Sequence, residues 1–322
     1  MPSQAPVYLD CDTGIDDALT IAYLVAQQAS LVGIGTVCGN IGSDQAARNT
    51  LDLLDLLGAP QIPVAVGAKD FTTAAFHGGA PDVHGSNGIG DVRLPASPRT
   101  PAEESAPQLL SRLAREYPGE LRVLAVGPLT NLGTALTDDP ELTGLVRDVT
   151  IMGGAAAAPG NVTAVGEANI INDPEAAARV VGADWDVTLV PLDVTMLQRI
   201  DAEQAGRLRS TGAPALVALA DMLEYYFDFY VDRLGERAAA LHDPLAAAVM
   251  LDTVTLTSGP RLPVVVDDSH GPGRGQTIVD RRDVYLGYPA QRPEDVRVAL
   301  QIDDDFGSEL TRSLLSAFAG TR

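Results

Sequence analysis

The sequence predicts an α/β protein with an open, mostly parallel sheet flanked by helices, and three observations support this fold class. Short apolar and β-branched runs alternate with segments of helical periodicity along the chain. Strands separated by helices form βαβ units, whose strands run parallel. Polar residues directly follow several predicted strands, and parallel sheets bind ligands beyond the carboxyl ends of their strands.

The chain begins with two strand–helix pairs. "VYLDCD" predicts a strand within residues 6–12, and "DDALTIAYLVAQQ" predicts a helix over 16–28. "LVGIGTVCG" predicts the second strand within 31–39. "DQAARNTLDLLDLLG" predicts a helix that stops at Gly58, because its apolar residues recur at helical spacing and glycine favours a helix C-terminus.

Further strands and helices follow in the rest of the chain. The runs "LRVLAVG", "RDVTIMGG" and "WDVTLVPLDVT" predict three more strands, and residues 201–234 predict one helical segment. The closing stretches "GQTIVD" and "DVRVALQIDDDFGSELTRSLLSAF" predict strand, strand and helix. Because no repeat, coiled coil or linker divides the sequence, we expect residues 1–322 to form a single domain.

Two loops are long and carry polar residues. Residues 68–100 are rich in Gly, Pro and small polar residues and exceed a routine connection, which is typical of functional lids or disorder. Residues 153–172 form the second such loop. The aromatic stretch "EYYFDFYVDR" within 221–240 allows two interpretations: an aromatic stripe packed into the core, or rings that close over a ligand by stacking.

Composition and charge exclude several classes of protein. The 322 residues carry a formal charge of −21 with a single lysine, so binding to a nucleic-acid polymer is disfavoured and a small neutral or cationic substrate fits better. No apolar stretch is long enough to cross a bilayer, and the first ten residues do not resemble a signal peptide. Cys11 and Cys38 are the only cysteines, so we expect a reducing, cytoplasmic setting. From the charge and the apolar stretches we expect neither a membrane nor a nucleic-acid polymer as a partner.

Four aspartates crowd the end of the first strand. The stretch "YLDCDTGIDDAL" contains Asp10, Asp12, Asp16 and Asp17 within eight positions, where like charges repel. Hard cations such as Ca²⁺ take oxygen ligands, and a turn can fold Asp12, Asp16 and Asp17 onto one ion. Alternatively, Asp16 and Asp17 are first-turn acids that complement a helix dipole.

Other polar residues have both a structural and a functional interpretation. In "LHDPLAAAVM", Asp243 as an N-cap and Pro at the first helical position account for part of the motif, but not for His242. Asn161, Glu167 and Asn169 are turn formers when taken singly.

Taken together and in order, these segments resemble the inosine–uridine preferring nucleoside hydrolase family. The resemblance runs from about Val7 to Phe318 and is carried by "DCDTGIDDA", "CGN", "VGPLTN", "IMGGA", "GNVTAVGEANIINDPEAA", "PLDVT" and "LHDPLA". It implies a Rossmann-like nucleoside hydrolase fold and an enzyme that hydrolyses the N-glycosidic bond of ribonucleosides. It also implies Ca²⁺ as the cofactor, a small ribonucleoside as the partner, and a homodimer or homotetramer.

The resemblance also implies a role for each matching residue. Calcium is held by Asp12, Asp17, the backbone carbonyl of Val126 and Asp243. Asp12 acts in addition as general base on a water at the metal, and His242 assists departure of the base. Ribose contacts fall on Asp16, Asn40, Met152, Asn161, Glu167 and Asn169. His84, in "VHGSNGIG", is a candidate on the side of the base, and Asp10 lies behind the metal ligands. Residues 68–100 and 221–240 are then the expected active-site lids.

Two other functions stay open from the residues alone. A Mg²⁺-dependent aspartyl-phosphate phosphatase would use Asp10 as its nucleophile, but Thr13 stands one place early for the D-x-D-x-T pattern. A non-catalytic nucleoside- or ribose-binding protein on the same scaffold is the other alternative.

Overall fold

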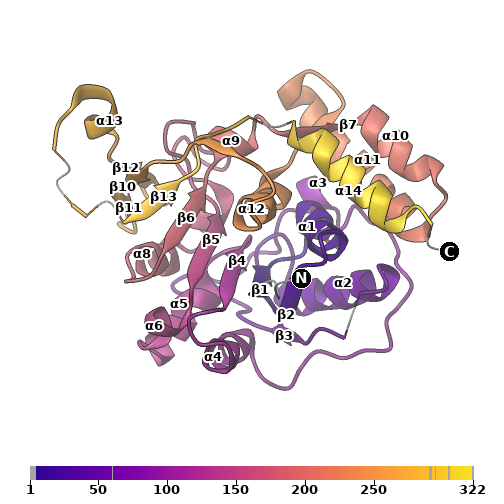
Figure 1. Cartoon of the computed structure of the whole chain (residues 1–322), viewed down its shortest axis with the longest axis horizontal. Helices are drawn as coiled ribbons and strands as arrows, with labels where there is room; N and C mark the ends of the chain where they lie inside the picture. Colours follow the sequence, from indigo (N-terminus) through magenta and orange to yellow (C-terminus); the bar gives the residue numbers. More distant parts are fainter. Residues whose placement is uncertain (1–4, 60, 290–291, 294, 304, 321–322) are drawn as a thin grey trace.

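The computed structural model describes residues 5–59, 61–289, 292–293, 295–303 and 305–320. Its centre is a sheet that has eight strands in the described part of the chain (Figure 1). In spatial order they are β10 (Arg261–Leu262), β13 (Val296–Val298), β6 (Val187–Val190), β5 (Asp148–Met152), β4 (Arg122–Ala125), β1 (Pro6–Cys11), β2 (Ser30–Thr36) and β3 (Val64–Val66). Every neighbouring pair is parallel except β10 with β13. This confirms the predicted α/β class with an open, mostly parallel sheet.

Helices cover both faces of the sheet. Side chains alternate between the two faces along each strand, so apolar side chains on both faces need a covering layer. On β1, Val7 and Leu9 belong to one apolar cluster, and Tyr8 between them belongs to the other. The first cluster contains residues of α1 (Ile15–Ala26), α2 (Ser43–Leu56), α10 (Ala202–Ser210), α11 (Pro214–Leu234), α12 (His242–Met250) and α14 (Phe306–Phe318). The second contains residues of α4 (Ala106–Glu116), α5 (Thr130–Asp138), α6 (Leu142–Leu145) and α8 (Pro174–Val181).

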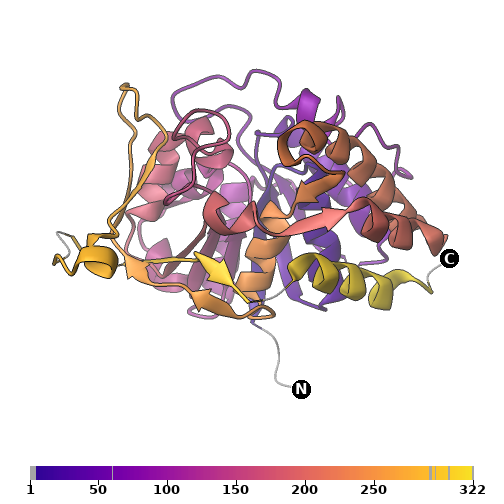
Figure 2. The same ribbon diagram turned by 90° about the horizontal axis from the view of Figure 1, so that it is seen from above.

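Smaller elements complete the chain. Among the described residues, three two-stranded pairs lie outside the main sheet: β11 (Val264–Val266) with β12 (Thr277–Val279), β9 (Leu256–Ser258) with β14 (Gln301–Ile302), and β7 (Arg199–Asp201) with β8 (Ala238–Ala240). Besides α6, the short helices of the described chain are α3 (Pro81–His84), α7 (Ala168–Asn172), α9 (Leu192–Thr195) and α13 (Arg282–Leu286). Figure 2 shows β7 running across the molecule between α9 and α10. A search of the described helices finds no stretch with the length and apolar character that crossing a bilayer requires.

The predicted strand–helix order is confirmed, with two corrections. Residues 201–234 form two helices, since Gly212 has a positive φ of 70° and Pro214 begins the next helix. The run at 185–195 is a strand only to Val190, because Pro191 ends it and α9 follows. The loop at 68–100 is confirmed as mostly irregular, with only the short α3 inside it.

Candidate active site

The carboxyl ends of four adjacent strands bring the predicted site residues together. Asp12 follows β1, Asn40 follows the end of β2, Val126 follows β4, and Met152 ends β5. These strands are neighbours in the order β5-β4-β1-β2, so residues more than a hundred positions apart lie at one edge. A cavity of about 210 Å³ opens beside them.

Asp12 and Asp17 are fixed by the turn between β1 and α1. Asp17 Oδ2 accepts the N–H of Gly14 (2.7 Å) and Asp17 Oδ1 accepts the N–H of Asp12 (3.1 Å). Asn40 donates to Asp12 Oδ2 from its backbone N–H (2.6 Å) and to Oδ1 from its side chain (3.2 Å). A Cβ on Gly39 would lie 2.0 Å from Asp12 Oδ2, so glycine is required there for this approach.

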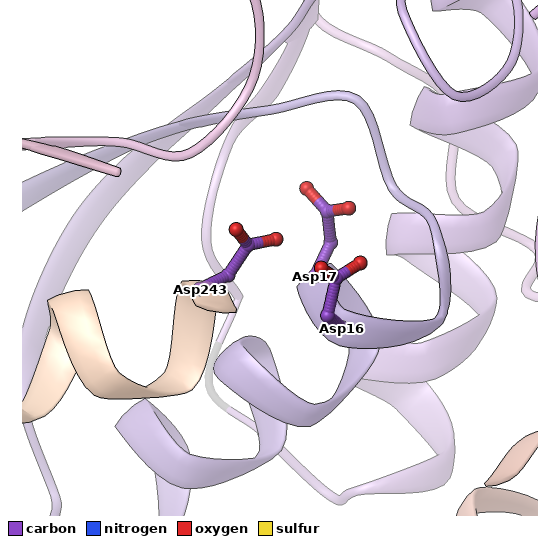
Figure 3. Close-up of side chains that lie close together, drawn as sticks. All are labelled: Asp16, Asp17 and Asp243. Carbon is purple, nitrogen blue, oxygen red and sulfur yellow. The ribbon is translucent and has the colours of Figure 1, made fainter. Parts of the chain in front are cut away.

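The start of α12 brings a further acid to the same place. Figure 3 shows the carboxylate of Asp243 reaching from α12 towards Asp16 and Asp17 at the start of α1. Carboxylate oxygens of these three buried residues lie within 4.8 Å of one another, so the cluster could hold a metal ion. Helix α12 begins at His242, so Asp243 lies in the first turn and not at the N-cap position.

The electrostatics of the cluster fit a cation. Burial raises the pKa of Asp243 well above its usual range, and the neighbouring Asp16, Asp17, Asp12 and Glu167 raise it further. Burial, together with Asp16, raises the pKa of Asp17 to about 7. Oδ1 of Asp16 is buried without a hydrogen-bond partner in the described structure. Buried carboxylates that face one another are stabilised either by protonation or by a bound cation. A hard divalent cation is the kind of ion that oxygen ligands bind.

Asp12 belongs to this charge cluster, but neither Asp12 nor Asp17 is among the described residues that line the cavity. Burial and the charge of Asp17 raise the pKa of Asp12, while its two oxygens accept hydrogen bonds from Asn40. The group within 4.8 Å contains Asp16 in place of Asp12. The ligand roles of Asp12 and of the Val126 carbonyl therefore stay predictions; that carbonyl accepts from Asn169 Nδ2 at 2.9 Å.

The predicted ribose residues line the cavity. Asp16, Asn40, Met152, Asn161, Glu167 and Asn169 are all among its walls. Glu167 caps α7 by accepting the N–H groups of Asn169 (3.0 Å) and Ile170 (3.2 Å), and burial raises its pKa to about 7. Asn161 is exposed at the rim, where its Oδ1 accepts the Ala168 N–H (3.0 Å).

A cluster of rings also lines the cavity. The Tyr226 hydroxyl donates to Asp16 Oδ2 (3.2 Å), and the Tyr230 hydroxyl bonds His242 Nε2 (2.8 Å). His84 Nδ1 accepts the N–H of Ile15 (3.1 Å), and its ring lies 5.5 Å from that of Tyr226. Burial lowers the pKa of both His84 and His242, which favours the neutral form of each imidazole.

For Tyr226 and Tyr230 the interpretation as an aromatic stripe packed into the core is confirmed, whereas stacking over a ligand stays a prediction. Tyr226 and Tyr230 are buried in the core cluster and also line the cavity. Sequence reasoning did not assign their hydroxyl contacts to Asp16 and His242. Their spacing of four residues places them on one helix face, but it does not identify these partners.

Asp10 lies behind the site. Its carboxylate accepts from Asn131 Nδ2 (3.2 and 3.1 Å) and from the Tyr8 hydroxyl (2.9 Å), and burial raises its pKa to about 7. It is not among the described residues that line the cavity. This position gives no support to a role as a phosphatase nucleophile.

Comparison with known proteins identifies the family. Residues 7–307 match the model of the inosine-uridine preferring nucleoside hydrolase family. Uridine nucleosidase 1 of Arabidopsis thaliana is 36% identical over 85% of this chain and 81% of that protein. The pyrimidine-specific ribonucleoside hydrolase RihA of Citrobacter koseri is 36% identical over 98% of this chain and 99% of its own.

Solved structures give the same result. The purine-preferring ribonucleoside hydrolase from Gardnerella vaginalis superposes with a TM-score of 0.89 at 34% identity, covering 98% of this chain and 99% of that one. Sequence, fold and site together show that the chain belongs to the inosine-uridine preferring nucleoside hydrolase family and is a ribonucleoside hydrolase, an enzyme that cleaves N-glycosidic bonds.

Proposed function

We propose that this enzyme hydrolyses ribonucleosides to ribose and free base in a Ca²⁺-dependent reaction, with Asp12 as general base and His242 as the acid for the leaving base. The observation that carries the proposal is the buried group of Asp16, Asp17 and Asp243 beside Asp12, at the wall of a cavity that also contains His242. Asp12, Asp17, Asp243 and the Val126 carbonyl would hold the ion. A bound Ca²⁺ balances the carboxylate charges and makes a nearby water more acidic.

The reaction divides between the two sides of the cavity. A water oxygen attacks C1′ of the ribose as the bond from C1′ to the base nitrogen breaks, through an oxocarbenium-like transition state. Asp12 takes the proton of that water, and the base receives a proton from His242, whose Nε2 bonds Tyr230. Burial favours the neutral imidazole of His242. Negative charge that develops on the leaving base favours the protonated imidazole and offsets the effect of burial.

The polar wall supports ribose as the required sugar. Asp16, Glu167 and Asn169 are buried and would form hydrogen bonds with ribose hydroxyls. A deoxyribose lacks one of these hydroxyls, so its binding would leave a buried polar group without a hydrogen-bond partner. We expect kcat/KM for 2′-deoxynucleosides to be lower by at least about a hundredfold. The preferred base is a separate matter, because relatives of about equal identity are named for pyrimidine and for purine substrates.

Several further features belong to this proposal. Residues 68–100 supply Ala80, Val83 and His84 to the cavity wall, and 221–240 supply Tyr226 and Tyr230, which supports both as lids. Both cysteines are buried free thiols, which fits a cytoplasmic location. We also propose that the chain forms a single domain and assembles as a homodimer or homotetramer, which the family resemblance implies.

The test measures ribose released from inosine, uridine, cytidine and adenosine. The purified enzyme is treated with EDTA, and Ca²⁺, Mg²⁺ or Zn²⁺ is restored separately. Ribose release that depends on Ca²⁺ supports the proposal. No ribose from any substrate with Ca²⁺ present defeats it, and tight ribonucleoside binding without turnover favours the non-catalytic alternative. Phosphate release from an aryl phosphate with Mg²⁺ favours the phosphatase.

A further inference from the structure

The geometry points to helix α9 as a positioning element of the active site: Thr195 orients His242, and Asp193 fixes the backbone that leads to Asn161. Neither Asp193 nor Thr195 is among the described residues that line the cavity. The inference rests on the proposed function, because it concerns the residues assigned there to the leaving base and to ribose.

Thr195 holds the ring of His242 from behind. Its side chain is fully buried, and Oγ1 lies 2.8 Å from His242 Nδ1. The Tyr230 hydroxyl lies 2.8 Å from Nε2 at the other end of the ring, so both ring nitrogens are bonded to hydroxyls. When Nε2 gives its proton to the leaving base, Nδ1 keeps its own proton and needs an acceptor. A hydroxyl provides one at Nδ1, whereas valine has the same shape and no acceptor.

Asp193 fixes the start of the loop between β5 and α7. Its carboxylate accepts the backbone N–H groups of Ala156 (2.7 Å), Ala157 (2.7 Å) and Ala158 (3.1 Å). The two preceding N–H groups are bound by Glu167 Oε2 (2.9 Å) and Thr277 Oγ1 (2.8 Å). Side chains thus accept consecutive backbone N–H groups from residue 154 to residue 158. An irregular segment held this completely has little freedom, and it leads directly to Asn161 at the cavity rim.

One short helix can serve both purposes because of its geometry. Pro191 ends β6, and the chain turns at once into α9. Residues two positions apart on a helix do not share a face, so Asp193 and Thr195 reach different neighbours. The two contacts therefore affect separate steps: Thr195 acts on the leaving base through His242, and Asp193 acts on ribose binding through the loop.

The experiment compares kcat and KM for uridine, inosine and p-nitrophenyl riboside in the Ca²⁺-loaded enzyme. Thr195→Val should lower kcat for the nucleosides about tenfold or more, with little change for p-nitrophenyl riboside, whose leaving group needs no proton. Thr195→Ser should restore most of that loss. Asp193→Asn should raise KM for all three substrates several-fold with a smaller change in kcat. Asp193→Glu, which moves the acceptor by one methylene, is a second variant with the same expected rise.

Thr311→Val is the matched control. Thr311 is also a fully buried threonine, bonded to the Gly307 carbonyl (2.8 Å) within α14, and lies outside the cavity lining. Its kinetic constants should stay near those of the wild type.

Three results would overturn the inference. Equal losses on nucleosides and p-nitrophenyl riboside in Thr195→Val, or no recovery with serine, would remove the role of Thr195. An unchanged KM in both Asp193 variants would remove the role of Asp193. His242→Ala is measured in parallel: a leaving-group effect there with none in Thr195→Val refutes the inference and leaves the proposed function standing. If His242→Ala itself shows no leaving-group effect, both the acid assignment and the Thr195 role are wrong.

Discussion

Replacing Asp243 by asparagine should stabilise the metal-free protein and strongly weaken its response to calcium. Asp243 is 2% exposed, and the charged groups that act on its carboxylate are the acids Asp16, Asp17, Asp12 and Glu167. Asparagine has nearly the same shape and no charge. The substitution therefore removes repulsion in the absence of a cation, but it also removes a ligand that the cation would use.

The magnitude follows from the separation of the carboxylates. Oxygens of Asp16, Asp17 and Asp243 lie within 4.8 Å of one another. At an effective dielectric constant of about 20, each ionised pair at that separation costs about 3.5 kcal/mol. Protonation limits this cost, so we expect a gain of about 2–3 kcal/mol at pH 8. For a chain of 322 residues that gain corresponds to a rise in Tm of about 3–4 °C.

The sign of the pH dependence provides an internal check. Burial and like charges raise the folded-state pKa of Asp243 above the unfolded value of about 3.9, and they raise that of Asp17 to about 7. The folded protein then binds more protons than the unfolded chain between those values. The contribution of these two carboxyl groups to stability is fully present below about pH 4 and is lost as the pH rises through their raised pKa values. The difference between variant and wild type should therefore be largest at pH 8 and small at pH 5.

The assay is thermal unfolding of both proteins at pH 5 and pH 8, in EDTA and in millimolar CaCl₂. Calcium should raise Tm of the wild type at pH 8 and change that of Asp243→Asn much less. An Asp243→Asn protein that is no more stable than the wild type in EDTA at pH 8 would refute the repulsion. An equal rise in Tm with Ca²⁺ in both proteins would refute the role of Asp243 as a ligand.

Three further predictions concern single positions. Asp12→Ala should lower kcat at least about a thousandfold, because it removes both the proposed base and a ligand; a near-normal kcat in a ribose-release assay would contradict both roles. Tyr226→Phe, which removes the hydroxyl that donates to Asp16, should lower kcat/KM for uridine several-fold and leave Tm within a few degrees, and unchanged kinetics would show that this bond is dispensable. Phe306→Ala should cost about 3–5 kcal/mol in the free energy of unfolding, since the ring is fully buried against Tyr23 at 5.5 Å. Its kcat, corrected for the folded fraction, should be unchanged, and urea unfolding with a loss below about 1 kcal/mol would contradict the packing.

Much of the fold and of the first half of the site could be predicted from local sequence. The run of Val7–Leu9 followed by Asp10 and Asp12 identifies a buried strand and the polar residues beyond it, because both features depend on neighbours in the chain. The same holds for Asn40 after the second strand. Element boundaries were predicted less well: Gly212 and Pro214 are poor helix formers that mark the break between α10 and α11, and the prediction of helix across 201–234 did not use them.

The sequence by itself determined the strand–helix alternation, the cluster of four aspartates and the resemblance to the family. Each of these depends on short segments of neighbouring residues, or on the order of such segments along the chain. Only the tertiary structure decided that Asp243 lies against Asp16 and Asp17, that Tyr226 and Tyr230 bond Asp16 and His242, and that Asp193 and Thr195 reach the loop and the ring. The physical reason is that these contacts join segments tens to hundreds of residues apart. Their geometry depends on how α11 and α12 pack against α1 and the sheet, which no local pattern specifies.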